Sequence, residues 1–236
     1  METKSVKQIL RVLVGSQAHG LATPESDYDY RGVFVNPTSE ILRLGSKVKD
    51  TDWHEDFVDD TSWEIGHFLN LAIHCNPTIL EVFLAPIPIK KDEPPVGGHY
   101  FADASSEGME LRELFPIIWN SKGVFDSFTG YGFNQRKKFL DNKDNRAAKY
   151  AAAYLRTLYQ GWELLTTGTF TIRIIDTPIG PRVRDWKDGK YSVGEVIQIC
   201  TDWQVKVEEA YKNNPDKQTD MEKVNEFLLK IRKDNW

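Results

Sequence analysis

Two aspartates and a glycine–serine pair lie near the start of the 236-residue chain, and their types and spacing suit phosphate chemistry. Asp27 and Asp29 are two residues apart in an alternating segment, so a strand would point both carboxylates to one side, about 7 Å apart. Carboxylates this close repel each other, and a cation between them would relieve the repulsion. Mg²⁺, with Mn²⁺ as the alternative, suits the pair because it binds one or two carboxylates and keeps other positions for water and phosphates.

Gly15 and Ser16 precede this pair and have the character of a phosphate-binding turn. Glycine lets the backbone turn tightly and approach a ligand closely. A helix that starts near Gln17 would direct its free amides to the same place, which favours phosphate. A shared pocket for phosphate and metal ions is what nucleotidyl transfer needs. Taken alone, an Asp-x-Asp pair is more typical of a solvated surface, so the hypothesis depends on the combination.

Four basic residues are further candidates for nucleotide binding. Arg31 lies two residues beyond Asp29, where it would reach a triphosphate or form a plain salt bridge. His19 follows the glycine–serine turn, where it would contact phosphate or a nucleobase, or have a structural role. Lys149 and Arg156 are seven residues apart and share one face of a helix, which either an anion or plain solvation would explain.

Two basic and aromatic clusters offer phosphate contacts and base stacking, which together hold single-stranded nucleic acid. A solvated helix face is the alternative for both clusters. The formal net charge of −5 argues against a uniformly basic nucleic-acid-binding module and leaves room for a local patch. The clusters are Tyr131, Phe133, Arg136, Lys137 and Lys138, and Arg182, Arg184, Trp186 and Lys187.

The elements that must position these residues begin with a small sheet and two helices. Aliphatic and alternating runs predict the strands, and the helices are expected to begin at Ser62 as N-cap and after Asn76-Pro77. Glu64 and Glu81 are assigned structural roles in these helices. The predicted strands are the second half of 6–14, 27–35 and 54–60, with a loop over 38–54.

The remainder of the chain is predicted to be mainly helical. A segment rich in proline and glycine, 85–98, is the expected junction between a domain over residues 1–98 and a helical domain over 99–236. Apolar residues three and four apart predict the helices. The expected helices are 105–114, 120–141, 145–166, 193–211 and 221–233, with a short strand at 171–175 and an irregular connection at 181–192.

Residues 13–35, LVGSQAHGLATPESDYDYRGVFV, resemble the signature of the DNA polymerase β-like nucleotidyltransferase superfamily. More narrowly, they resemble its group of predicted nucleotidyltransferases found beside RNA ligases. Two further blocks, 60–83 and 149–170, are similar to the same group, so the resemblance spans most of the chain. It implies an α/β fold in which a nucleotidyltransferase domain with a small mixed sheet is followed by a helical domain that closes the cleft.

The resemblance also implies a third metal-binding carboxylate from the next strand. The matching position is Asp60, and the competing positions are Glu55, Asp56 and Asp59. A third acid is reasonable because two carboxylates incompletely coordinate two divalent ions.

The third block places Lys149 and Arg156 toward the triphosphate or an acceptor strand. It also departs from the family, because relatives carry a histidine where this chain has Ala153. That departure puts in doubt a base or ligand role at this position, and acceptor binding is where this chain could differ from its relatives.

Together these features predict an enzyme that transfers a nucleoside monophosphate from a nucleoside triphosphate, expected to be ATP, to a hydroxyl acceptor. An RNA end is the first choice of acceptor. The alternatives are adenylylation of a protein or a small molecule, and a nucleotide-binding protein without catalysis. Cys75 and Cys200 are far apart, and no leader sequence or apolar run of about 18 residues is evident, so a reducing cytoplasmic setting without a membrane is expected.

Overall fold

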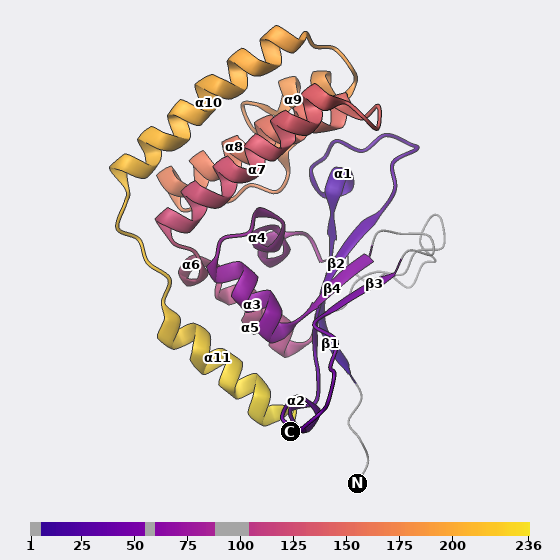
Figure 1. Cartoon of the computed structure of the whole chain (residues 1–236), viewed down its shortest axis with the longest axis vertical. Coiled ribbons are helices and arrows are strands. Elements are labelled where there is room, and N and C mark those ends of the chain that lie inside the picture. Colours follow the sequence, from indigo (N-terminus) through magenta and orange to yellow (C-terminus); the bar gives the residue numbers. More distant parts are fainter. Residues whose placement is uncertain (1–5, 55–59, 88–103) are drawn as a thin grey trace.

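The computed structural model describes residues 6–54, 60–87 and 104–236. Four strands form one mixed sheet, in which β1 and β3 run antiparallel to their neighbours and the central pair β2 and β4 is parallel. The predicted α/β class with a small mixed sheet is confirmed (Figure 1). The strands are β1 (Lys7–Val14), β2 (Asp29–Val35), β3 (Thr51–His54) and β4 (Asp60–Glu64), in the order β1-β2-β4-β3.

The β1–β2 hairpin sets the position of the acidic pair. Val14, the last residue of β1, lies opposite Asp29, the first residue of β2. The turn that starts at Gly15 and the aspartates therefore lie at the same end of the sheet. Val12 and Val33 are fully buried, which anchors this end in the core.

Sequence reasoning misplaced the third strand and the start of the next helix. Residue 54 ends β3 and Asp60 begins β4, while 55–59 lie outside the described residues. Ser62 is a β4 residue, and the N-cap of α3 (Ile65–Ile73) is Glu64, whose carboxylate accepts a 2.7 Å bond from the Gly66 N–H. Ser62 does not cap a helix because β4 pairs with strands on both sides, and this pairing provides hydrogen-bond partners for its backbone groups.

The helices are otherwise mostly where the apolar spacing predicted them. Asn76 caps α4 and Pro77 stands at its start, as expected. The long helices α7, α8 and α10 form an upper layer above the sheet (Figure 1). Besides α3, the α-helices of the described residues are α1 (Gly15–Ala18), α2 (Thr38–Ile41), α4 (Pro77–Leu84), α5 (Ser106–Glu113), α6 (Phe115–Ile118), α7 (Ser121–Asp141), α8 (Ala147–Thr167), α9 (Gly180–Lys187), α10 (Val193–Asn213) and α11 (Met221–Asp234).

Two predictions after α8 are wrong. The expected strand at 171–175 is a loop followed by a 3-10 turn, Ile174–Asp176. Side chains of α8 form hydrogen bonds with backbone groups of this loop, in place of a neighbouring strand. Glu163 accepts from the Thr171 N–H at 2.6 Å, and Gln160 donates to the Thr171 carbonyl at 2.9 Å. The expected irregular stretch at 181–192 contains α9, which has a proline in its first turn and the buried Val183 and Trp186 on its inner face.

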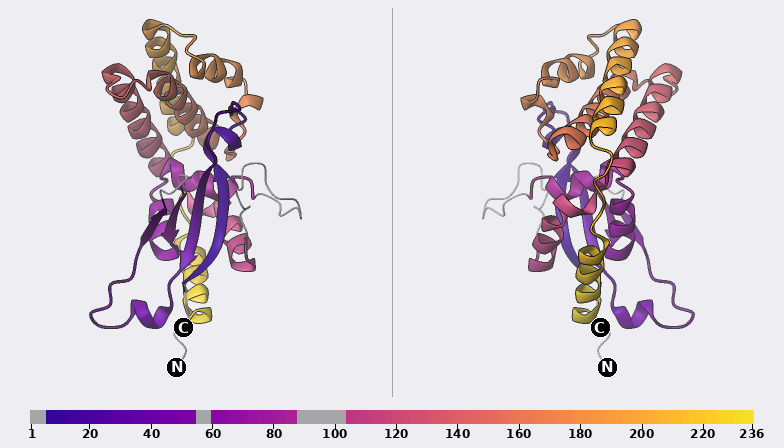
Figure 2. Two further views of the ribbon diagram at one scale, coloured as in Figure 1. Left: turned by 90° about the vertical axis from the view of Figure 1, so that its right-hand side faces the viewer. Right: turned by 90° about the vertical axis from the view of Figure 1, so that its left-hand side faces the viewer.

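The C-terminal helix returns to the sheet half of the molecule. Helix α11 lies beside α3 and the lower end of the sheet, while the segment that carries α2 projects from that end (Figure 2). Helix α5 also packs on β1, where the Ser105 N–H bonds to the Ile9 carbonyl at 2.9 Å. Of the junction expected at 85–98, residues 88–98 lie outside the described part, and the domain boundary stays a prediction.

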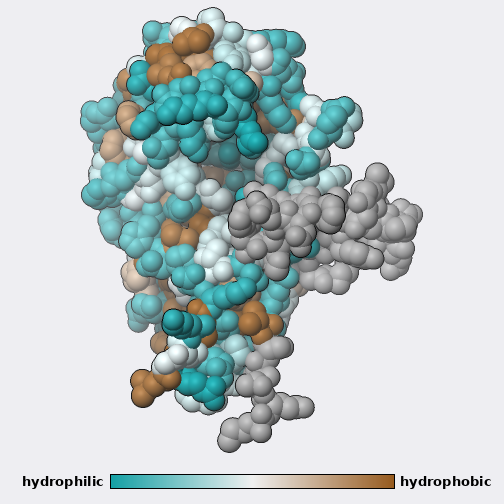
Figure 3. Space-filling view, turned by 45° about the vertical axis from the view of Figure 1, so that its right-hand side comes forward, coloured by the Kyte–Doolittle hydropathy of each residue, from teal (hydrophilic) through white to brown (hydrophobic). Residues whose placement is uncertain are grey.

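The face shown in Figure 3 is mostly hydrophilic, with hydrophobic residues in small separate patches. Among the described residues, no helix is both long and apolar enough to cross a membrane.

Candidate functional site

A cavity of about 490 Å³ lies where the end of β1 and the start of β2 meet helices α8 and α9. It brings together every predicted site residue except Arg31 and Asp60. Residues distant in sequence thus line one cavity. This is the arrangement expected if a helical part of the chain closes over the sheet. The predicted residues in its lining are Gly15, Ser16, His19, Asp27, Asp29, Lys149 and Arg156.

The acidic wall of the cavity is built on the β1–β2 hairpin. Asp29 opens β2, whereas Asp27 lies before the strand, so strand geometry alone does not align the two carboxylates as predicted. Both nevertheless line the cavity, together with Glu25. A bond of 3.2 Å from the Gln17 side chain to the Ser26 carbonyl ties this segment to α1.

The Gly15 turn approaches Asp29 so closely that a side chain at residue 15 would displace the Asp29 carboxylate. Gly15 has a φ of +67°, and a Cβ on it would lie 2.2 Å from Asp29 Oδ2. Bonds from the His19 N–H to the Gly15 carbonyl and from the Leu21 N–H to the Ser16 carbonyl close the turn. Helix α1 is one turn long, and it forms two residues earlier than the expected start near Gln17.

His19 is a buried residue in a polar chain that sequence reasoning did not foresee. Its Nε2 lies 2.8 Å from Glu81 Oε1, and Arg156 Nη1 lies 3.8 Å from Glu81 Oε2. Burial raises the pKa of Glu81, but His19, Arg156 and Arg31 lower it by more, to about 2. Burial, followed by the charge of Arg156, lowers the pKa of His19. The ionised Glu81 carboxylate can only accept, so the bond runs from the Nε2–H of His19 to Glu81.

The basic wall faces the acids from helices α8 and α9. Lys149 and Arg156 come from α8, Arg146 is the N-cap residue of that helix, and Lys187 comes from α9. Sequence reasoning found Lys149 and Arg156 but missed Arg146, although it lies three residues before Lys149 and so shares their helix face. Lys187 was noted only within a basic and aromatic cluster. Ala153, the position that departs from the family, also lines the cavity.

Arg31 and Asp60 lie elsewhere. Arg31 Nη1 donates to the Tyr30 carbonyl at 2.7 Å. Asp60 Oδ2 accepts from Arg11 Nη2 at 2.6 Å. Because Asp60 pairs with Tyr30 in the parallel ladder, its side chain points to the sheet face opposite that of Asp29.

The structure therefore does not bring Asp60 to the other two acids, and its metal-binding role stays a prediction. The competing acids Glu55, Asp56 and Asp59 lie outside the described residues.

The residues present fit a metal ion whose ligands come partly from the protein and partly from a bound substrate. Within the described ranges, no group of three or more His, Cys, Asp or Glu side chains is arranged to hold a metal ion. Asp27 and Asp29 are a pair of carboxylates in a cavity with four cations opposite. Mg²⁺ often binds through one or two carboxylates plus substrate phosphates, so the pair is sufficient for such a site.

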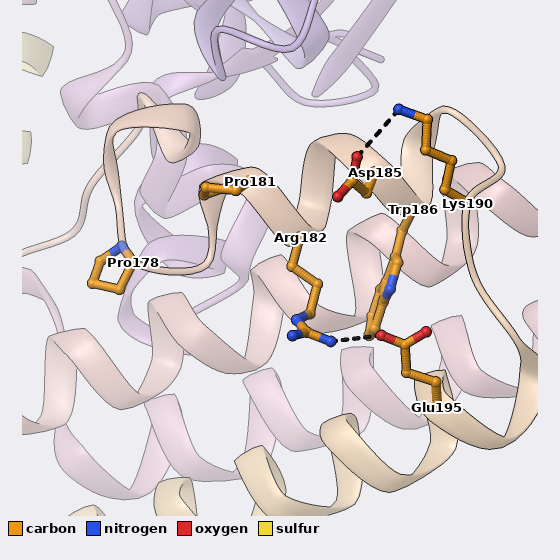
Figure 4. A pocket seen from close by; sticks show the side chains of 7 residues that line it. All are labelled: Pro178, Pro181, Arg182, Asp185, Trp186, Lys190 and Glu195. Atoms are coloured by element: carbon orange, nitrogen blue, oxygen red, sulfur yellow. Dashed lines mark hydrogen bonds and ion pairs between the residues drawn. The ribbon is translucent and has the colours of Figure 1, made fainter.

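A second cavity, of about 270 Å³, lies beside α9 and the start of α10. Its charged residues pair with one another: Arg182 with Glu195 at 2.6 Å, and Lys190 with Asp185 at 3.3 Å (Figure 4). Trp186 is only 1% exposed, so it is not available to stack on a base. The stacking partner expected in this cluster is thus buried, and the role of the cluster in nucleic-acid binding stays a prediction.

The family model described as the RNA repair pathway DNA polymerase beta family matches residues 1–173. The chain belongs to this family. The predicted resemblance to a polymerase β-like nucleotidyltransferase group tied to RNA repair is thereby confirmed. Helices α9, α10 and α11 lie beyond the matched residues.

A curated relative is an uncharacterised 38.9 kDa protein from the nrdC-mobD intergenic region of Enterobacteria phage T4. It is 28% identical over 101 residues, which cover 39% of this chain and 30% of the phage protein. The match thus spans less than a third of that protein's length.

Proposed function

We propose that this protein transfers a nucleoside monophosphate from a nucleoside triphosphate, with ATP as the first candidate, to a hydroxyl acceptor. The observation that carries the proposal is one cavity lined both by the aspartate pair, from the β1–β2 hairpin, and by cations from the start of α8, from α8 itself and from α9. A triphosphate with its metal ion matches that division of charge, because the metal needs carboxylates and the phosphates need cations.

Asp27 and Asp29 would hold Mg²⁺, with Mn²⁺ as the alternative. When bound, the metal would polarise the reacting phosphate and lower the pKa of the attacking hydroxyl. Gly15 and Ser16 would hold the outgoing phosphates, since the backbone approaches closely there. His19, beside them, lines the same space and is fixed by Glu81.

The acceptor oxygen would form a bond to the α-phosphorus, and the bond from that phosphorus to the bridging oxygen of the β-phosphate would break. Pyrophosphate would leave with the electron pair of that bond, and the hydroxyl proton would pass to solvent. Lys149 and Arg156 would stabilise the negative charge that develops on the phosphates. The protein's contribution is thus orientation and charge stabilisation.

An RNA end is the acceptor we propose first, because the family is described by an RNA repair pathway. The α7 cluster supports it. Arg136, Lys137 and Lys138 follow Phe133, whose side chain is 57% exposed and able to stack. A protein hydroxyl or a small molecule is the alternative.

The test incubates the protein with each labelled nucleoside triphosphate, Mg²⁺ or Mn²⁺, and separate RNA, DNA and protein acceptors. Transfer to RNA that is abolished in Asp27→Asn and Asp29→Asn, and retained in the exposed control Asp202→Asn, would support the proposal. Metal-dependent binding without transfer would instead indicate a non-catalytic nucleotide-binding protein. Neither binding nor transfer would refute the function.

The third acid is tested in the same assay. Asp60→Asn is compared with Asp59→Asn, Glu55→Gln and Asp56→Asn. If Asp60 acts only through its Arg11 ion pair, its variant keeps transfer and loses stability, and a different acid variant loses transfer. Loss of Mg²⁺-dependent transfer in Asp60→Asn, with an unchanged melting temperature, would restore Asp60 as the ligand.

A further inference from the structure

We propose that Lys187, on helix α9, is a phosphate-binding residue of the main cavity, in addition to the cations Arg146, Lys149 and Arg156 that also line it. The inference rests on the proposed function, because the anion is taken to be the triphosphate of the nucleotide. It adds to that function a residue from outside the family match, because α9 lies beyond residues 1–173.

Lys187 is held at the cavity rather than free to swing in solvent. It lines the space, and its Nζ donates to the Leu21 carbonyl at 2.6 Å. An ammonium group has three donors, so this bond leaves two for a ligand. Leu21 ends the turn that begins at Gly15, and the ammonium is thereby fixed beside the turn proposed to hold the phosphates.

The helix that carries Lys187 is locked to the same turn by other bonds. Arg184 donates to the Gly20 carbonyl at 2.7 Å and to the Leu21 carbonyl at 3.0 Å. The Ile175 N–H bonds to the His19 carbonyl at 3.1 Å. Gly20 has a φ of +71°, and a Cβ on it would lie 2.4 Å from the Ile175 side chain. This close contact keeps Lys187 in place before any ligand arrives.

The electrostatic surroundings of Lys187 favour an anion. In the part of the chain that the structure describes, no ion pair is formed between Lys187 and a carboxylate. Burial lowers the pKa of Lys187, and the charges of Arg184 and Lys149 lower it too, while Asp188 raises it. Lys187 and Lys149 thus place positive charge together in a partly buried cavity, and a phosphate would neutralise it.

The competing explanation is that Lys187 only fastens α9 to the turn. Arg184 provides the matched control, because it bonds to the same Leu21 carbonyl and also to the Gly20 carbonyl, but does not line the cavity. Removing Arg184 therefore removes more of the fastening than removing Lys187, while the cavity keeps its inward ammonium.

The experiment measures binding of inorganic tripolyphosphate by titration calorimetry, without metal and with a chelator present. The full chain is compared with Lys187→Met, Lys187→Arg and Arg184→Met, and melting temperatures show that each is folded. Lys187→Met is expected to weaken binding about tenfold or more, which is typical for loss of a hydrogen bond to a charged group. Lys187→Arg keeps most of the affinity. Arg184→Met lowers the melting temperature but changes the affinity less than about threefold.

The inference fails if Lys187→Met binds tripolyphosphate as the unchanged protein does, or if Arg184→Met weakens binding as much as Lys187→Met. It also fails if the unchanged protein does not bind tripolyphosphate. The readout involves neither metal nor acceptor, so an absence of nucleotidyl transfer leaves it intact. Conversely, unaltered transfer kinetics in Lys187→Met would refute the inference and leave the proposed function standing.

Discussion

Two features favour glycine at position 15, one in the backbone and one in the space beside it. Its φ of +67° lies in the left-handed region, and the carboxylate of Asp29 occupies the place where a side chain would begin. The first feature concerns the backbone, while the second concerns the position of a proposed metal ligand. The two features can be separated because another glycine of this chain has only the first.

Gly15→Ala is expected to destabilise the fold by about 1–2 kcal/mol through the left-handed backbone and to abolish nucleotide binding by displacing Asp29. Gly45→Ala is the control, since Gly45 has a φ of +77° and no atom lies within 4 Å of the place that its methyl group would take. Chemical denaturation and nucleotide titration measure both effects. Equal binding by the two variants would show that the Asp29 contact is unimportant.

Glu81 gives the fold a defined acid sensitivity. Its pKa falls from 4.5 to about 2 on folding, with His19, Arg156 and Arg31 as the charges that outweigh burial. A carboxyl with a lowered folded-state pKa contributes stability above its unfolded pKa and loses it as the pH falls through the folded value. The shift corresponds to about 3 kcal/mol, lost between about pH 4.5 and about pH 2.

Glu81→Gln should therefore be less stable than the unchanged protein at about pH 7, and the gap should narrow at about pH 3. Urea denaturation at both pH values measures it. The comparison cancels the titration of all other groups, which both proteins share. A gap of the same size at both pH values would contradict the role given to Glu81.

At the scale of elements, α7 begins on a residue that joins three segments. Asn120 caps the helix by accepting from the Gly123 N–H at 2.7 Å. Its amide also donates to the Ile73 carbonyl at 3.0 Å and to Thr219 Oγ1 at 3.2 Å. The cap thus also connects α7 to the end of α3 and to the segment before α11.

Asn120→Ala should cost about 2 kcal/mol, since it removes the cap and both donor bonds. Asn120→Ser keeps a cap oxygen and loses the amide, so it should cost about half as much. Thermal denaturation of the two variants checks the order. Equal losses would mean that capping contributes little to this helix start.

Across the whole molecule, the last helix fastens the helical half to the sheet half. Arg232 of α11 donates to Glu64 from both terminal guanidinium nitrogens, Nη1 and Nη2, at 2.5 and 2.8 Å, and Glu64 is also the N-cap of α3. Thr38 adds bonds to the Arg232 and Asn235 carbonyls. These contacts cross the expected division at residue 98, so the two halves should unfold together.

Arg232→Met leaves the buried Glu64 carboxylate without its partner and should cost about 3 kcal/mol. Lys230→Met, which breaks an exposed ion pair between α11 and Glu110 of α5, should cost less than about 1 kcal/mol. The expectation that the two halves unfold together has its own test. Denaturation of the unchanged protein, monitored by tryptophan fluorescence and by circular dichroism, should give one coincident transition. Two separate transitions would show that the halves are independent.

Local patterns alone were enough to predict much of this molecule. Helical spacing located the long helices, and Asn76-Pro77 located the start of α4, because capping and apolar periodicity act over a few residues. The glycine–serine turn and the aspartate pair were recognised for the same reason. Arg146 was within reach of such reasoning too, since it shares a helix face with Lys149.

The tertiary structure decided what depends on pairing between distant segments. The parallel register of β2 and β4 puts Asp60 on the face away from Asp29, and a sequence does not state a register. The polar chain from His19 through Glu81 to Arg156 joins three segments, and α9 adds Lys187 from beyond the family match. By itself, the sequence determined which residues are candidates to hold metal and phosphate. Packing determined which of them share a cavity, because that follows from contacts between segments far apart in the chain.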